Sequence, residues 1–89
     1  MRKVHIYIDG TVLGVGFRTY IKRHAERIGI NGYVRNIEGG IEVIAEGESA
    51  AIDVLVELCR KGPSEAEVSN VTVENEPPNF LFKDFVIRP

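Results

Sequence analysis

The hydrophobic and polar positions follow two different periods near the start of the chain. Residues 3–9 alternate strictly, with Val4, Ile6 and Ile8 separated by polar or aromatic side chains. This period of two predicts a strand with one buried face. From residue 17 to residue 28 the apolar side chains recur at spacings of three and one, which predicts an amphipathic helix that Gly29 ends.

The middle of the chain predicts two strands followed by a second helix. Residues 30–36 and 41–46 predict two strands, and the Gly39-Gly40 pair between them is typical of a hairpin turn. Residues 48–61 predict a second helix, which Gly62-Pro63 ends. The apolar side of this helix carries Ala51, Ile52, Leu55, Leu58 and Cys59.

The last third of the chain predicts two more strands. The first contains Val68, Val71 and Val73, and Pro77-Pro78-Asn79 predicts a turn after it. Residues 82–88 predict the closing strand, with an irregularity at Lys83-Asp84, where the alternation slips. The order β-α-β-β-α-β with a final strand predicts an α+β, ferredoxin-like sandwich, a mostly antiparallel sheet with two helices on one face. We expect residues 1–89 to form one domain.

The segment from Gly10 to Arg18 joins the first strand to the first helix and is the main candidate for chemistry. Glycines at 10, 14 and 16 let the backbone turn tightly, so that several N–H groups point into one small concavity. The helix start adds unpaired donors and the positive end of a dipole. Arg18 adds a permanent planar cation. The segment therefore predicts a site for an anion.

Charge and composition narrow the remaining possibilities. The formal net charge is -2, and the Lys and Arg residues are scattered along the chain, so we expect neither nucleic acid nor a membrane surface as a partner. No His, Cys, Asp and Glu residues stand at metal-ligand spacing. The single Cys59 cannot form an internal disulfide and is expected to be buried, which fits a cytoplasmic protein. We interpret His5, Tyr7 and Asp9 as structural or solvated, and His24 as partly buried.

Two motifs, one after the other along the chain, resemble the signatures of the acylphosphatase family. The first is the segment Gly10 to Arg18, in which Gly10, Val12, Gly14, Val15, Phe17 and Arg18 fit the family pattern. The second is Gly32-Tyr33-Val34-Arg35-Asn36. The resemblance covers essentially the whole chain. Leu13 stands where the family usually has Gln, Thr11 where a basic residue is frequent, and the hairpin at 37–40 is one residue shorter than the common form.

The resemblance implies an enzyme that hydrolyses the carboxylic-phosphoric anhydride of an acyl phosphate, without metal or cofactor, and releases a carboxylate and inorganic phosphate. It implies that the backbone amides of Val15, Gly16, Phe17 and Arg18 bind the phosphoryl oxygens. It further implies that the Arg18 side chain pairs with these oxygens and that Asn36 holds the attacking water. We expect the enzyme to be a monomer.

These residue types suit that chemistry. The conjugate acid of a carboxylate leaving group has a pKa of about 4, so the group departs at neutral pH without a general acid. Arginine and backbone amides gather the charge of the phosphoryl group, and Asn36, which is neutral, orients the water and does not act as a base.

Two other classes of function stay open. A phosphate-binding or regulatory module of the same fold would hold the anion with little or no turnover. An RNA-binding sheet would need aromatic residues on its central strands and a basic surface, and the strands around Ile6 and Val43 offer neither.

Overall fold

The computed structural model describes residues 1–89 and forms a five-stranded sheet with two helices. In chain order the elements are β1 (Arg2–Thr11), α1 (Phe17–Arg27), β2 (Asn31–Ile37), β3 (Gly40–Gly47), α2 (Ser49–Lys61), β4 (Glu67–Glu76) and β5 (Phe85–Arg88). Each predicted helix and strand is present, and the helix and strand boundaries before residue 62 lie within one or two residues of those predicted.

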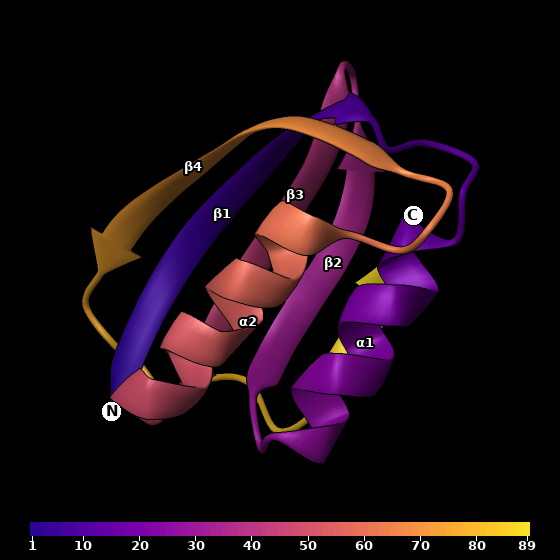
Figure 1. Ribbon diagram of the computed structural model, residues 1–89. Helices are drawn as coiled ribbons and strands as arrows, with labels where there is room; N and C mark the ends of the chain where they lie inside the picture. The colour runs from indigo at the N-terminus through magenta and orange to yellow at the C-terminus, as the bar shows by residue number, and fades with distance from the viewer.

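The strands lie in the order β4-β1-β3-β2-β5. β1 pairs antiparallel with β3 and with β4, and β2 pairs antiparallel with β3. Only β5 runs parallel to its neighbour, β2. Both helices cover the same face of the sheet (Figure 1). The predicted ferredoxin-like architecture is therefore confirmed.

The core lies between the two helices and the covered face of the sheet. In β1 the fully buried Val4, Ile6 and Ile8 stand opposite Ala45, Val43 and Ile41 of β3. The side chains of residues directly opposite each other on neighbouring strands point to the same face of the sheet. The alternating apolar residues of the sequence therefore form one continuous apolar layer. Ile21, Ile52 and Leu55 cover this layer from the helices and have no exposed surface.

The closing strand is shorter than the sequence predicts, because β5 begins at Phe85 and not at residue 82. The irregularity at Lys83-Asp84 is confirmed as a bend. The backbone before it bonds to a side chain instead of a strand, since the buried carboxylate of Glu46 accepts hydrogen bonds from the amides of Asn79 (2.9 Å) and Phe80 (3.2 Å). Regular pairing starts only after the carbonyl of Asp84 has accepted the amide of Gly32 (2.8 Å).

The uncovered face of the sheet carries a network of hydrogen-bonded ionisable side chains, which we call the open-face cluster: His5, Arg35, Glu42 and Glu76. The ring of His5 lies between two carboxylates, with Nε2 at 2.8 Å from Glu42 and Nδ1 at 3.2 Å from Glu76. Arg35 Nε donates to the same Glu42 carboxylate. Glu42 is only 7% exposed. His5 is thus structural, as predicted.

The charge partners in this cluster decide the ionisation of Glu42. Burial alone raises the pKa of a carboxyl group, because it removes water from the charged form. Hydrogen bonds from Arg35 and His5 outweigh this effect and hold the pKa of Glu42 below its ordinary value. The ionised state of Glu42 in the folded protein therefore depends on Arg35 and His5.

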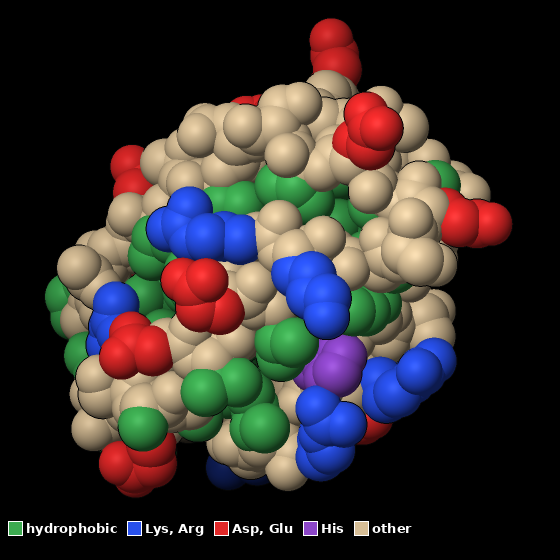
Figure 2. Space-filling view, in the orientation of Figure 1, with side chains coloured by type: hydrophobic (Ala, Val, Ile, Leu, Met, Phe, Trp, Pro, Cys, Tyr) green, Lys and Arg blue, Asp and Glu red, His purple; other side chains and the backbone are tan.

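The predictions for Cys59 and His24 are also confirmed. Cys59 is fully buried in the core, and burial raises the pKa of its thiol to about 12, so the group stays protonated and inert. His24 is half-buried on α1 and receives a hydrogen bond from Arg27 Nη2 to its Nδ1 (2.6 Å). Lys and Arg side chains gather around the histidine on the helix-covered face (Figure 2). Burial first, and then Arg27, Arg23 and Lys61, lower its pKa.

Candidate active site

The loop between β1 and α1 is shaped by two glycines in the left-handed region of backbone space. Gly14 has φ of 75° and Gly16 has φ of 77°. An added Cβ would meet no atom within 4 Å at either position, so space does not dictate glycine there. The backbone conformation does, because a side chain in this region costs about 1–2 kcal/mol. Gly16 is also the N-cap residue of α1.

This loop leaves a row of backbone donors without partners. The N-cap offers no side-chain acceptor to the first turn of α1. The amides of residues 14–19 donate no hydrogen bond to any backbone or side-chain acceptor, and the first bond of the helix runs from the amide of Tyr20 to the carbonyl of Gly16 (3.1 Å). Unpaired amides at a helix start, together with the positive end of the helix dipole, bind anions.

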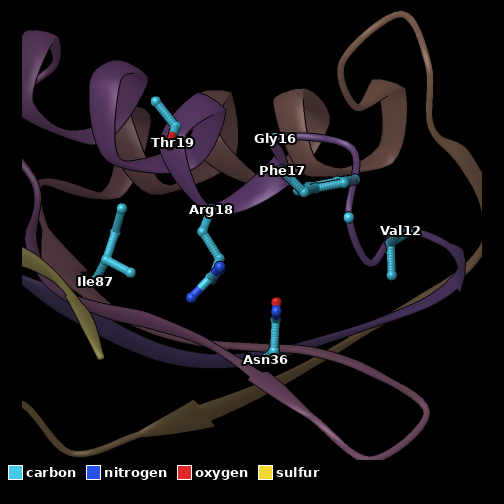
Figure 3. Close-up of a pocket in the computed structure, with 8 residues that line it drawn as sticks. Val12, Gly16, Phe17, Arg18, Thr19, Asn36 and Ile87 are labelled. Atoms are coloured by element: carbon cyan, nitrogen blue, oxygen red, sulfur yellow. The ribbon is translucent and has the colours of Figure 1, made fainter. Parts of the chain in front are cut away.

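A small cavity of about 140 Å³ lies against these donors. It is lined by Val12, Gly14, Gly16, Phe17, Arg18, Thr19, Asn36 and Ile87. Arg18 is the only charged residue among them, and none carries a carboxylate, a thiol or an imidazole. In Figure 3 the Arg18 and Asn36 side chains both reach into the space between α1 and β2. The loop, the first turn of α1 and the end of β2 therefore meet at one site.

The Arg18 side chain is free to bind a ligand. It lies in the first turn of α1, is half-buried, and takes part in none of the side-chain hydrogen bonds or ion pairs of the protein. Arg35 of β2, in contrast, is bound to Glu42 on the opposite face of the sheet. An unpaired guanidinium is a planar donor that suits the oxygens of a phosphate group.

Asn36 reaches the same cavity from the sheet. It stands opposite Ile41 in the pairing of β2 with β3, on the face that also buries Val34. Unlike Val34, Asn36 is exposed. Its side-chain amide has no hydrogen-bond partner in the protein, so it can bind a water molecule or a substrate oxygen.

The structure brings together most of the residues that the sequence singled out. Gly16, Phe17, Arg18 and Asn36 line the cavity. Val15 does not line it, because its half-buried side chain packs against the core. Its backbone amide nevertheless belongs to the unpaired row.

Three further lining residues were not predicted from the sequence: Val12, Thr19 and Ile87. Thr19 could have been found, because the first turn of any helix has unpaired amides. Ile87 carries no local signal, since it reaches the site only through the pairing of β5 with β2.

No group of three or more His, Cys, Asp or Glu residues is placed to hold a metal ion. No helix is long and apolar enough to span a membrane.

Comparison with known proteins gives one consistent result. A sequence model of the acylphosphatase family matches residues 4–87. An acylphosphatase of Rubrobacter xylanophilus is 42% identical over 88 residues, covering 98% of this chain and 80% of that protein. An acylphosphatase of Pseudomonas paraeruginosa is 44% identical over 86 residues, covering 96% of this chain and 93% of that protein. The crystal structure of acylphosphatase from Bacillus subtilis matches with a TM-score of 0.96 at 30% identity and covers 100% of both chains.

The fold and the cavity define a small α+β protein with a cavity and a row of unpaired backbone donors at the start of its first helix. With the sequence match over residues 4–87, the chain belongs to the acylphosphatase family. Enzymes of this family are acid anhydride hydrolases that cleave acyl phosphates. Acyl phosphate is accordingly the substrate and inorganic phosphate a product.

Proposed function

We propose that the cavity at the start of α1 binds the phosphoryl group of the acyl phosphate and that Arg18 and Asn36 are the catalytic residues. One observation carries this proposal: the unpaired amides of residues 14–19, the unpaired Arg18 side chain and the unpaired Asn36 amide share a single cavity. In this role the amides of Val15, Gly16, Phe17 and Arg18 donate to the phosphoryl oxygens. Thr19 extends the row by one donor.

The reaction needs little more than positioning and charge. The oxygen of a water molecule attacks phosphorus, the bond between phosphorus and the acyl oxygen breaks, and the carboxylate leaves with the bonding electron pair. One proton of the water stays on the attacking oxygen and the other moves to an oxygen of the phosphate product. A leaving group whose conjugate acid has a pKa of about 4 needs no protonation, which agrees with the lack of an acidic side chain around the cavity.

Arg18 stabilises the charge that the phosphoryl group carries in the transition state. A guanidinium can donate two parallel hydrogen bonds to phosphate oxygens, each about 1.5–3 kcal/mol. Removing both is therefore expected to reduce kcat/KM by about 10³-fold. Asn36 is neutral and orients the attacking water, and loss of correct positioning costs about 10²-fold.

Hydrolysis of benzoyl phosphate tests this assignment. We expect the parent protein to hydrolyse it, and Arg18→Ala and Asn36→Ala to lose most of kcat/KM while keeping their unfolding midpoint. Arg23→Ala is the matched control, because Arg23 is an exposed arginine on the same helix that does not line the cavity. Retained turnover in Arg18→Ala would reject its role. Phosphate binding without turnover in the parent would favour a binding module instead.

We also propose that the protein is a monomeric enzyme of the cytoplasm with no nucleic-acid or membrane partner. The only cysteine is a buried, protonated thiol, which fits a compartment in which disulfides do not form. The protein's mass of 9.9 kDa makes size-exclusion chromatography with light scattering a direct test of the monomer, and a mass near twice this value would reject it.

A further inference from the structure

The cavity holds only part of an acyl phosphate. Sites that enclose drug-sized ligands have volumes of about 300–1,000 Å³, whereas this cavity measures about 140 Å³. If the phosphoryl group occupies the space beside the loop amides, as proposed above, the acyl group must lie at the mouth of the cavity. The side chains at the mouth then decide which acyl groups bind well.

The mouth is apolar on the side of β5. Ile87 lines the cavity and is 38% exposed. It stands opposite the buried Val34 in the parallel pairing of β5 with β2, so its side chain lies on the face that carries Asn36. In Figure 3 the Ile87 side chain lies beside Arg18.

A second exposed apolar residue belongs to the same region. Leu13 is 45% exposed and stands in the chain between Val12 and Gly14, which both line the cavity. Ile87 and Leu13 are two of only six large hydrophobic residues with this degree of exposure in the chain: Met1, Leu13, Val54, Phe80, Leu81 and Ile87. Exposed apolar side chains beside a polar site often mark the part of a ligand that is apolar.

The charges around the cavity disfavour an anionic acyl group. Arg18 is the only charged residue in the lining, and in the proposed function its guanidinium is taken up by the phosphoryl group. An acyl group with its own carboxylate would therefore find no second cation in the lining, and the nearby Lys22, which donates to the carbonyl of Phe85, is already paired with Glu26. The carboxylate would also lose water beside Ile87. We infer that Ile87 is a specificity-determining residue and that the enzyme prefers acyl phosphates whose acyl group is uncharged and apolar, such as an aromatic or branched aliphatic group.

This inference rests on the proposed function and is tested by comparing three substrates, acetyl, benzoyl and succinyl phosphate. Each variant is compared with the parent on the same substrate, so that differences in intrinsic reactivity cancel. We expect Ile87→Ala to lower kcat/KM for benzoyl phosphate about fivefold more than for acetyl phosphate, because the larger apolar group loses more contact. We expect Ile87→Lys to shift the ratio of succinyl to benzoyl phosphate by more than tenfold toward succinyl.

Val86→Ala is the matched control. Val86 precedes Ile87 in β5 and stands opposite Tyr33, on the other face of the sheet, so this variant should leave the substrate ratios unchanged. Equal losses on acetyl and benzoyl phosphate in Ile87→Ala would overturn the inference, as would the same change of ratio in Val86→Ala.

Failure of the proposed function itself gives a different result, which is no turnover of any of the three substrates by the parent protein. In that case calorimetry with benzoylphosphonate and acetylphosphonate, which are not hydrolysed, still tests the inference. The inference is supported if the parent binds benzoylphosphonate more tightly than acetylphosphonate and if this difference is smaller in Ile87→Ala. It is overturned if the parent and Ile87→Ala bind benzoylphosphonate with equal affinity.

Discussion

Two arginines, one on each side of the sheet, differ in whether they have an acidic partner. Arg35 on the uncovered face donates to the buried carboxylate of Glu42, which also binds His5. Arg18 on the covered face has no acidic partner and lies in a cavity lined by no carboxylate. The open-face cluster thus satisfies its charges within the fold, whereas the cavity leaves a cation and a row of amides unsatisfied.

This difference separates stabilising charges from charges that are available to a ligand. A charge that is paired and desolvated supports the folded state, and removing one partner leaves the other buried and unpaired. A charge without a partner contributes little to folding but can bind an anion without first breaking another bond. Removing a charge from the open-face cluster should therefore reduce stability, whereas removing Arg18 should reduce activity.

The largest expected effect comes from the two arginines themselves. Arg18→Ala should lower kcat/KM for an acyl phosphate by about 10³-fold with no change in the unfolding midpoint. Arg35→Ala should lower the thermal midpoint and leave kcat/KM within threefold, because Arg35 does not line the cavity. Steady-state kinetics and thermal unfolding of both variants give the four values needed. A loss of stability in Arg18→Ala, or a large loss of activity in Arg35→Ala, would contradict the comparison.

Gly16→Ala tests the loop that holds the amides. The residue has φ of 77°, so alanine should destabilise the protein by about 1–2 kcal/mol and reduce kcat/KM about tenfold by displacing the donors. Denaturant unfolding and kinetics measure both. Gly39→Ala is the control, because Gly39 also has a positive φ (84°) and open space around it but lies in the β2–β3 hairpin. Equal losses of activity in the two variants would argue against a special role for the loop.

Glu42→Gln tests the open-face cluster through its dependence on pH. The pKa of Glu42 in the folded protein lies below its ordinary value of 4.5, so its charged form stabilises the fold above that pH and the effect is lost as the pH falls through the folded-state pKa. The parent should be more stable than Glu42→Gln at neutral pH, and the two should converge below pH 4.5. Unfolding midpoints at several pH values measure this, and a constant difference between the two proteins would refute the assignment.

The smallest effect is expected for Leu13→Gln, which places a polar amide side chain in the loop. The backbone donors do not depend on this side chain, so kcat/KM for acetyl phosphate should change less than threefold. A gain above tenfold would mean that a side chain at this position, and not the loop amides, limits the reaction.

The fold could be predicted from the sequence largely because its periods are clear. The alternation of Val4, Ile6 and Ile8 is confirmed as the buried face of β1, and the stop signal at Gly62 is confirmed, since its amide closes α2 on the carbonyl of Leu58 (2.9 Å). The start of β5 was wrong by three residues. The segment ahead of β5 is held by hydrogen bonds from the amides of Asn79 and Phe80 to Glu46, 33 and 34 residues away in the sequence, and no local pattern indicates such a partner.

The site was predictable where it is local and not where it is assembled by the sheet. The loop from Gly14 to Arg18 is one continuous segment, so its glycines and its helix start could be interpreted together. The place of Asn36 beside it followed only from the resemblance to the family. Ile87 was missed, because only the parallel pairing of the closing strand brings it to the cavity.

The amides of the loop are expected to bind the phosphoryl group together with Arg18 and Asn36. Titration of the ¹⁵N-labelled protein with inorganic phosphate, followed by amide resonances, tests it most directly. The account predicts that the largest shifts fall on the backbone amides of residues 14–19 and on the side-chain amide of Asn36, and that they vanish in Arg18→Ala at the same phosphate concentration. Shifts that fall mainly on the open-face cluster, or an unchanged response in Arg18→Ala, would contradict it.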